Sequence, residues 1–219
     1  MRPNRGPLVR AFSCSETARA FKLIWHSAIQ PAMTPIDAAL VGVWLMLPAL
    51  IPNSAAVLLG GGRPMDFGKS WRGRRLLGDG KTWKGFLGGA LFGTAFGLLQ
   101  IGLAHSLGAE SSWGFGDWPW SLCVVLSLSF GSMIGDSAGS FVKRRLDIGS
   151  GDKAPILDQY NFVIGAVVLV LIFRSGWFLD HYIRGNGIYG LILFLIVAPL
   201  LHRGANIIGY KLGKKNVPW

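Results

Sequence analysis

The sequence predicts an all-α, polytopic integral membrane protein, with about five transmembrane helices and cytoplasmic loops that form a polar site. Of the 219 residues, 51% are hydrophobic and only 15% are charged, whereas a soluble domain carries about 25% charged residues. A helix needs about 20 predominantly apolar residues to cross a bilayer. The net charge of +11 is then best explained by one basic face at an anionic membrane surface, and no nucleic-acid partner is expected.

Hydrophobic runs recur along the chain at intervals that fit separate membrane crossings. They cover residues 36–59, 86–107, 120–142, 162–179 and 188–201, with a possible extension of the last run to 208. Pro48, Pro52 and Asn53 interrupt the first run, and Arg174 stands near the far end of the fourth. An arginine at that position can extend its side chain to the membrane interface.

Two domains of unequal size are predicted. Residues 1–32 are basic and only patchily apolar, so we expect a peripheral N-terminal segment without the apolar core of a signal peptide. Residues 33–219 contain every hydrophobic run and form a single membrane-embedded domain.

The charges of the connecting segments predict the orientation in the cell membrane. Seven basic residues against two acids occur in 60–85, and four basic residues each occur in 143–160 and in the C-terminal tail. Segment 110–119 has acids and no Lys or Arg. Because cytoplasmic loops carry an excess of Lys and Arg, the three basic segments and the active site are predicted on the cytoplasmic side. The basic N-terminal segment disagrees with this orientation.

Glycines repeat every four residues in two of the runs, which allows helix backbones to approach closely. The two stripes are Gly89, Gly93 and Gly97, and Gly131, Gly135 and Gly139. We expect them to serve packing, and a homodimer could use them as readily as a monomer.

Asp136 is the most informative single residue, because it lies inside the third hydrophobic run. A carboxylate at membrane depth is costly and is usually paired, bound to a ligand or exposed to water. On a helix, Asp136, Ser140 and Lys143 share one face that leads to Arg144. Two interpretations stay open: a structural Asp–Lys pair, or a site for a hard cation whose anionic ligand also contacts the basic residues.

Three further carboxylates follow in the third connecting segment. Mg²⁺ prefers carboxylate oxygens and substrate phosphates and needs only one or two protein carboxylates. Asp158 stands just before the fourth run and can return to the membrane surface near Asp136, so these two residues are the predicted metal ligands. Asp147 and Asp152 can instead be solvated partners of neighbouring basic residues.

A glycine-rich stretch, GDGKTWKG at 78–85, precedes the second run. It is not a P-loop, because Arg75 stands where that motif requires glycine. Backbone N–H groups at a helix start can nevertheless hold phosphate, and Lys81, Thr82 and Lys84 are predicted to contribute. The alternative is a basic loop that binds only anionic lipid.

Asn53 places an amide in the first run directly after Pro52. A proline at membrane depth frees a backbone carbonyl that a polar side chain can satisfy. This structural role and a substrate-binding role for Asn53 are equally open.

The stretch GDSAGSFVKRR…PILDQ resembles the signature of the CTP:phosphatidate cytidylyltransferases, the CDP-diacylglycerol synthases. The matching positions are Asp136, Ser140, Lys143, Arg144 and Asp158. The chain lacks that family's Gly-His-Gly-Gly before the last aspartate and has lysine at 84 in place of glutamate. Both departures are shared with the archaeal CDP-archaeol synthases, to which GDGKTWKGF, LPALIPN and LLGGGRPMDFGK are also similar.

This resemblance implies Mg²⁺-dependent transfer of CMP from CTP to an isoprenoid ether-lipid phosphate, 2,3-bis-O-geranylgeranylglycerol 1-phosphate, in the membrane lipid. It implies Asp136 and Asp158 as metal ligands and Lys143 as a further catalytic residue. The implied phosphate contacts are Lys81, Thr82, Lys84, Ser140, Lys143 and Arg144.

The residue types agree with this chemistry. The lipid phosphate is an ionised nucleophile, so the reaction asks chiefly for positioning and charge neutralisation. Two alternatives are a small ion-coupled transporter that uses Asp136 and a CTP-dependent polyprenol kinase. A transporter should have polar residues spread through the membrane, whereas here they gather at one surface.

Overall fold

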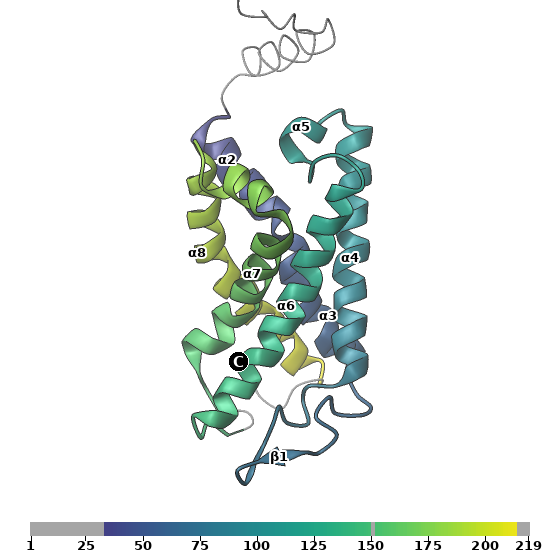
Figure 1. Cartoon of the computed structure of the whole chain (residues 1–219), viewed down its shortest axis with the longest axis vertical. Coiled ribbons are helices and arrows are strands. Elements are labelled where there is room, and N and C mark those ends of the chain that lie inside the picture. Colours follow the sequence, from purple (N-terminus) through teal and green to yellow (C-terminus); the bar gives the residue numbers. More distant parts are fainter. Residues whose placement is uncertain (1–32, 150–151, 214–219) are drawn as a thin grey trace, which may run out of the picture. The chain divides into compact units, whose positions relative to one another are not determined.

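The computed structural model describes residues 33–149 and 152–213 and is built almost entirely from helices (Figure 1). The helices are α2 (Pro35–Leu45), α3 (Leu47–Leu59), α4 (Trp83–Ser106), α5 (Glu110–Trp113), α6 (Trp120–Arg145), α7 (Pro155–Tyr182) and α8 (Gly187–Lys211). Five segments are long and apolar enough to cross a membrane, with α2 and α3 together making the first. The predicted all-α, polytopic fold is confirmed. The predicted N-terminal segment 1–32 lies outside the described residues.

Two helices extend further at the charged end than the hydrophobic runs indicated. Lys143 lies in the last turn of α6, on the helix that carries Asp136 as predicted, and Asp158 lies in the first turn of α7 although it was expected just before that helix. The helix dipole explains the difference, since it favours cations at a C-terminus and anions at an N-terminus. Pro155, at the start of α7, has a φ already suited to a first helical turn.

Glycine packing between α6 and α7 is confirmed. A Cβ atom at Gly135 would lie 2.2 Å from the carbonyl oxygen of Asn161, and one at Gly131 would lie 2.7 Å from that of Gly165. The α4 stripe makes similar approaches, to α3 at Gly89 and Gly93 and to α6 at Gly97. Both stripes are therefore used within one chain.

Prolines in the hydrophobic helices free carbonyl groups, and side chains from other helices bond to them. Pro48, Pro52 and Pro199 have no N–H for the carbonyl four residues earlier. The bonds are Gln100 Nε2 to Trp44 O at 2.8 Å, Ser129 Oγ to Pro48 O at 3.1 Å, and Tyr160 OH to Leu195 O at 3.2 Å. Each of these bonds satisfies a backbone carbonyl that would otherwise lack a hydrogen-bond partner in the bilayer.

The structural role proposed for Asn53 is wrong in its detail, because Ser129 satisfies the carbonyl that Pro52 frees. Asn53 Nδ2 donates instead to Ser132 Oγ at 3.3 Å, and Ser132 Oγ in turn donates to the Ala49 carbonyl at 2.7 Å. Asn53 thus joins α3 to α6, one helical turn from Asp136 along α6.

At the far end of the molecule, the backbone of α7 departs from helical geometry at Arg174 (φ −146°, ψ 50°). The Arg174 guanidinium lies over the ring of Trp120, 4.7 Å from its centroid. The arginine that interrupts the fourth run is accommodated by this break and by an aromatic partner.

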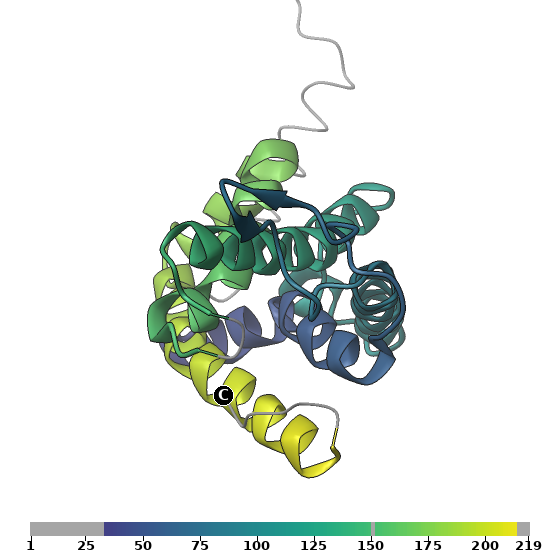
Figure 2. The same ribbon diagram turned by 90° about the horizontal axis from the view of Figure 1, so that it is seen from below.

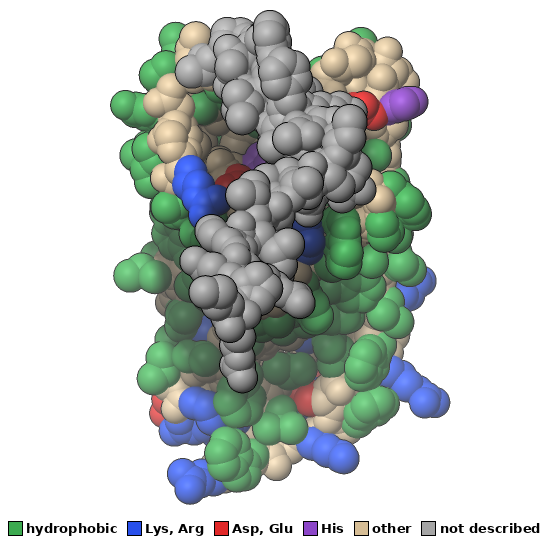
Figure 3. All heavy atoms as spheres, turned by 45° about the horizontal axis from the view of Figure 1, so that its top comes forward, with side chains coloured by type: hydrophobic (Ala, Val, Ile, Leu, Met, Phe, Trp, Pro, Cys, Tyr) green, Lys and Arg blue, Asp and Glu red, His purple; other side chains and the backbone are tan. Residues whose placement is uncertain are grey.

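The charged end of the bundle holds residues 60–82, 146–149 and 152–154, while α5 lies at the opposite end (Figure 1). Segment 60–82 contains a short antiparallel hairpin, β1 (Ser70–Trp71) and β2 (Arg74–Arg75), which crosses the end of α6 (Figure 2). Figure 3 shows apolar side chains over the middle of the surface and Lys and Arg side chains gathered toward its lower edge. The fold therefore delivers the polar residues to one end of the membrane helices.

Candidate active site at the charged end of the helices

Two lysine–carboxylate pairs form the centre of the candidate site. Lys81 Nζ donates to Asp136 Oδ2, and the two side chains are 26% and 19% exposed. Lys143 Nζ lies 2.8 Å from Asp158 Oδ1, with side chains 12% and 29% exposed. Lys143 also donates to the Asp152 carbonyl oxygen at 2.9 Å. Four of the predicted site residues are thereby brought into two partly buried ion pairs.

The structural Asp136–Lys143 pair considered from the sequence does not form. Seven residues of helix separate the two Cα atoms by roughly 10 Å along the axis, and each side chain finds a nearer partner on another segment. Segment 60–82 folds back so that Lys81 reaches Asp136, and α7 brings Asp158 to Lys143. Ser140 lies between Asp136 and Lys143 on α6, and its hydroxyl donates to the backbone carbonyl of Asp136 at 3.1 Å.

Thr82 and Lys84 lie at the start of α4, where phosphate contacts were predicted. Thr82 is the N-cap residue, is 7% exposed and accepts a hydrogen bond from Gly85 N at 3.1 Å. Lys84 is exposed in the first turn. The cap fixes where α4 begins and so fixes the position of the neighbouring Lys81.

Asp66 organises the loop that carries Lys81, a role that the sequence did not suggest. Its buried carboxylate bonds to Arg75 at 2.9 Å and accepts from the backbone N–H groups of Gly68, Leu77 and Gly78 at 3.0–3.1 Å. The Arg75 hydrogen bond, helped by these backbone donors and opposed by burial, holds the pKa of the Asp66 carboxyl well below its usual range. The one available signal was an acid within a basic, glycine-rich segment.

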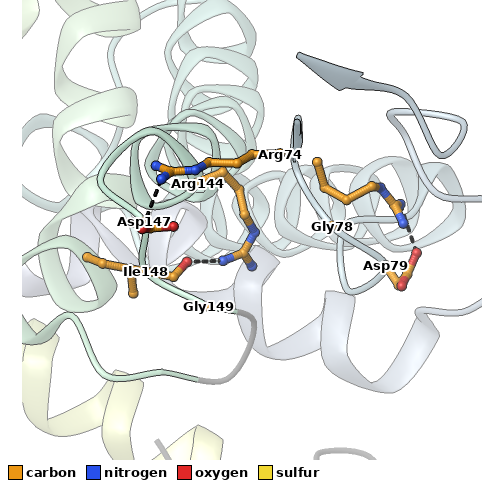
Figure 4. A pocket seen from close by; sticks show the side chains of 8 residues that line it. Arg74, Gly78, Asp79, Arg144, Asp147, Ile148 and Gly149 are labelled. Carbon is orange, nitrogen blue, oxygen red and sulfur yellow. Dashed lines mark hydrogen bonds and ion pairs between the residues drawn. The ribbon is translucent and has the colours of Figure 1, made fainter. Parts of the chain in front are cut away.

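A cavity of about 290 Å³ opens between segment 60–82 and the end of α6 (Figure 4). It is lined by Arg74, Arg75, Gly78, Asp79, Arg144, Asp147, Ile148 and Gly149. Arg74 pairs with Asp147 at 2.9 Å and Arg75 with Asp79 at 2.8 Å, while Arg144 donates to the Ile148 carbonyl. Asp147 is thus a solvated partner of a basic residue, as predicted, although the partner comes from the other loop.

Arg145 fastens the hairpin to the end of α6. Its guanidinium donates to the carbonyls of Trp71 and Arg75 at 2.8 Å and of Arg74 at 3.3 Å. It also lies over the rings of Trp71 and Phe141, 5.3 and 5.2 Å from their centroids. Since Arg74 and Arg75 line the cavity, Arg145 determines the position of one of its walls.

The carboxylate oxygens at this end are of the type that binds a hard cation, with the remaining coordination supplied by a bound substrate. Within residues 33–149 and 152–213, no three His, Cys, Asp or Glu side chains lie together as a metal site. Asp136 and Asp158 are the carboxylates predicted as metal ligands, and a magnesium ion shared with substrate phosphates needs only one or two protein carboxylates.

Five membrane-length segments within the described residues, with an arginine-lined cavity and two lysine–carboxylate pairs at one end, define a multi-pass membrane protein with a polar site at that end. Residues 35–219 match the family model described as CarS-like: CDP-archaeol synthase. The chain belongs to the CDP-archaeol synthase family.

Individual relatives agree with this assignment. The CDP-archaeol synthase of Methanocorpusculum labreanum is 46% identical over 182 residues, which cover 80% of this chain and 100% of the relative. That of Methanospirillum hungatei is 47% identical over 177 residues, with the same coverage. A solved structure, described as an intramembrane enzyme for archaeal membrane lipids biosynthesis, aligns with a TM-score of 0.57 and 38% identity over 77% of this chain and 94% of its own.

Proposed function

We propose that this protein is a membrane cytidylyltransferase that transfers CMP from CTP to the isoprenoid ether-lipid phosphate 2,3-bis-O-geranylgeranylglycerol 1-phosphate, giving CDP-archaeol and pyrophosphate. The family membership supports the reaction class. The observation that carries the proposal is the pairing of Lys81 with Asp136 and of Lys143 with Asp158 at the charged end of the apolar helices. The named relatives are synthases, which argues against the transporter and the polyprenol kinase.

The position of the site suits a substrate that is half lipid. The isoprenoid chains can stay against the apolar surface of the helices while the phosphate reaches the charged end. The cavity is near the lower limit of small-molecule pockets, roughly 300 Å³, and is expected to receive part of CTP. We assign the phosphate contacts to the predicted set, Lys81, Thr82, Lys84, Ser140, Lys143 and Arg144, with Asn53 deeper in the membrane.

In this reaction the protein side chains bind the substrates and neutralise phosphate charge, and none of them attacks the α-phosphorus. An oxygen of the lipid phosphate forms the new bond to the α-phosphorus of CTP, and the bond from that phosphorus to the oxygen bridging to the β-phosphate breaks, releasing pyrophosphate. Charge develops on the α-phosphoryl and leaving oxygens, and the ammonium groups of Lys81 and Lys143 are placed to offset it. No protein nucleophile is required.

Magnesium is the proposed metal, with Asp136 and Asp158 as its protein ligands. When bound, it would neutralise phosphate charge and hold the nucleotide in place. All the proposed ligands come from one chain, so a homodimer is not needed to complete the site.

We place the protein in the cell membrane with the site facing the cytoplasm, where CTP is made. The supporting observation is that the basic segments share the end that carries the site, while segment 110–119, which has acids and no Lys or Arg, lies at the other.

The decisive assay supplies purified protein with the lipid phosphate, Mg²⁺ and CTP labelled either in the cytidine or in the γ-phosphate. Cytidine label in the lipid phase is the expected result. Lipid labelled only from the γ-phosphate would identify a kinase, and an unlabelled lipid phase in both experiments would reject the proposed enzyme. A reaction without divalent cation tests the magnesium requirement separately.

A further inference from the structure

Each carboxylate proposed to bind the metal is already paired with a lysine in the ligand-free protein. We propose that Lys81 and Lys143 are internal counter-ions of the site, an inference that rests on the proposed function. Because of them, the site binds the metal–nucleotide complex in preference to the metal or the nucleotide alone. When the metal and the nucleotide bind, each lysine would move from its carboxylate to a phosphate, and each carboxylate would bind the metal. We call this the exchange of partners.

The partial burial of the pairs gives this exchange its energetic basis. Lys143 is 12% exposed and Asp136 is 19% exposed, so water compensates only part of any charge left without a partner. Removing one partner of a desolvated pair leaves an uncompensated charge, which is strongly unfavourable. The pairs are therefore stable until another ion can take the place of each departing partner.

Neither ligand alone satisfies that condition. A divalent cation that approaches Asp136 or Asp158 meets an ammonium group at hydrogen-bond distance from the same carboxylate and is repelled by it. A nucleotide without metal draws the lysines away but leaves its phosphates near two carboxylates that have lost their ammonium partners. Only joint binding gives every charge a partner, with ammonium on phosphate and carboxylate on metal.

Both lysines lie close in sequence to residues that line the cavity. Lys81 belongs to the turn closed by its own N–H and the Gly78 carbonyl, 3.2 Å apart, and Gly78 lines the cavity. Lys143 directly precedes Arg144, which also lines it. A lysine has a flexible four-carbon side chain, so rotation about its own bonds can transfer the ammonium group from carboxylate to phosphate.

This arrangement requires positive coupling between the two ligands. By thermodynamic linkage, CTP must raise the affinity for the metal by the same factor by which the metal raises the affinity for CTP. We expect that factor to be roughly tenfold or more, within the usual range of coupling between sites. Loss of either lysine should reduce it by strengthening the binding of the metal alone.

The test titrates Mn²⁺, detected by electron paramagnetic resonance, into purified protein without lipid phosphate, so that no turnover occurs. Wild-type protein should bind Mn²⁺ alone weakly, whereas Lys81→Met and Lys143→Met should bind it roughly tenfold more tightly. Lys81→Arg retains the counter-ion and should behave like wild type. Lys69→Met, an exposed lysine of the same loop, is the matched control and should also leave Mn²⁺ binding unchanged.

A second arm measures labelled CTP by equilibrium dialysis with EDTA or with saturating Mn²⁺. The Mn²⁺-dependent gain in CTP affinity should shrink in both methionine variants and persist in Lys81→Arg. Mn²⁺ binding to Lys81→Met and Lys143→Met that is no tighter than to wild type overturns the exchange. That outcome leaves the proposed function standing if CMP transfer is observed, so the two proposals fail separately.

Discussion

Asp136 places a carboxylate in a hydrophobic helix, and the cost of that position explains its partner. Lys81 comes from a loop that is 55 residues earlier in the chain, and the pair is only partly exposed. Because a lysine side chain is flexible, the ammonium group of Lys81 can give up its place on Asp136 to a metal ion.

Asp136→Asn should lower CMP transfer by at least about 100-fold, on the scale seen when one electrostatic contact to a transition state is lost. The amide has the size of the carboxylate but no charge, so the metal loses a ligand while the packing of α6 is kept. Initial rates with labelled CTP measure the loss, and the elution volume in detergent checks the fold. A mutant that transfers CMP at near-normal rates would remove Asp136 from the metal site.

Asp66 makes a different prediction, about pH. Its folded-state pKa lies well below the ordinary value of about 4, so the carboxylate contributes stability above pH 4 and loses it as the pH falls toward the folded pKa. Asp66→Asn should therefore have a lower unfolding temperature than wild type at pH 7. The difference in unfolding temperature between the two proteins should become smaller as the pH falls below 4. Thermal scans from pH 7 to pH 3 measure this; a gap that does not narrow as the pH falls would contradict the assignment.

At the scale of elements, the hairpin and the end of α6 act as one unit because Arg145 bonds to three of the hairpin's carbonyls. Arg145→Lys keeps the charge but lacks the planar group that reaches all three. We expect the KM for CTP to rise roughly tenfold, the equivalent of about one lost hydrogen bond, with a smaller change in kcat. Arg72→Lys is the control, because Arg72 lies over the Trp71 ring but is exposed. Equal effects of the two substitutions would exclude a positioning role for Arg145.

The contact between α6 and α7 sets the distance between the elements that carry Asp136 and Asp158. Gly135→Ala would force a methyl group to within 2.2 Å of the Asn161 carbonyl oxygen, and overpacking of this kind costs about 1–3 kcal/mol. Both the unfolding temperature and the transfer rate should fall. Gly102→Ala in α4 meets open space and should leave both unchanged or slightly improved; a similar loss in that variant would show that helix glycines matter for another reason.

The same elements show which features of the structure can be predicted from the sequence. Hydrophobic runs indicate the five membrane segments because bilayer thickness sets their length, and glycine spacing indicates which helix faces meet. The partners of Asp136, Asp147 and the Pro48 carbonyl could not be predicted, since each lies on a segment distant in sequence. Asp66 and Arg145 were missed for the same reason, because their roles depend on backbone groups of a folded loop.

In the whole molecule, the basic loops and the candidate active site lie at the same end of the helix bundle. The loops that carry the site are rich in Lys and Arg, while segment 110–119 at the opposite end has none. Basic loops are retained in the cytoplasm, and the same residues are needed for a nucleotide that is available only there. In the proposed function, the residues that bind the nucleotide are therefore also those that set the orientation of the chain.

Single cysteines test that orientation. In a background with Cys14 and Cys123 replaced by serine, Ser70→Cys marks the exposed hairpin and Ser111→Cys marks the exposed α5. A membrane-impermeant maleimide applied to spheroplasts should label Ser111→Cys at once and Ser70→Cys only after the membrane is permeabilised. The opposite pattern would place the site outside the cell, away from CTP, and would mean that the basic N-terminal segment rather than the loops determines the topology.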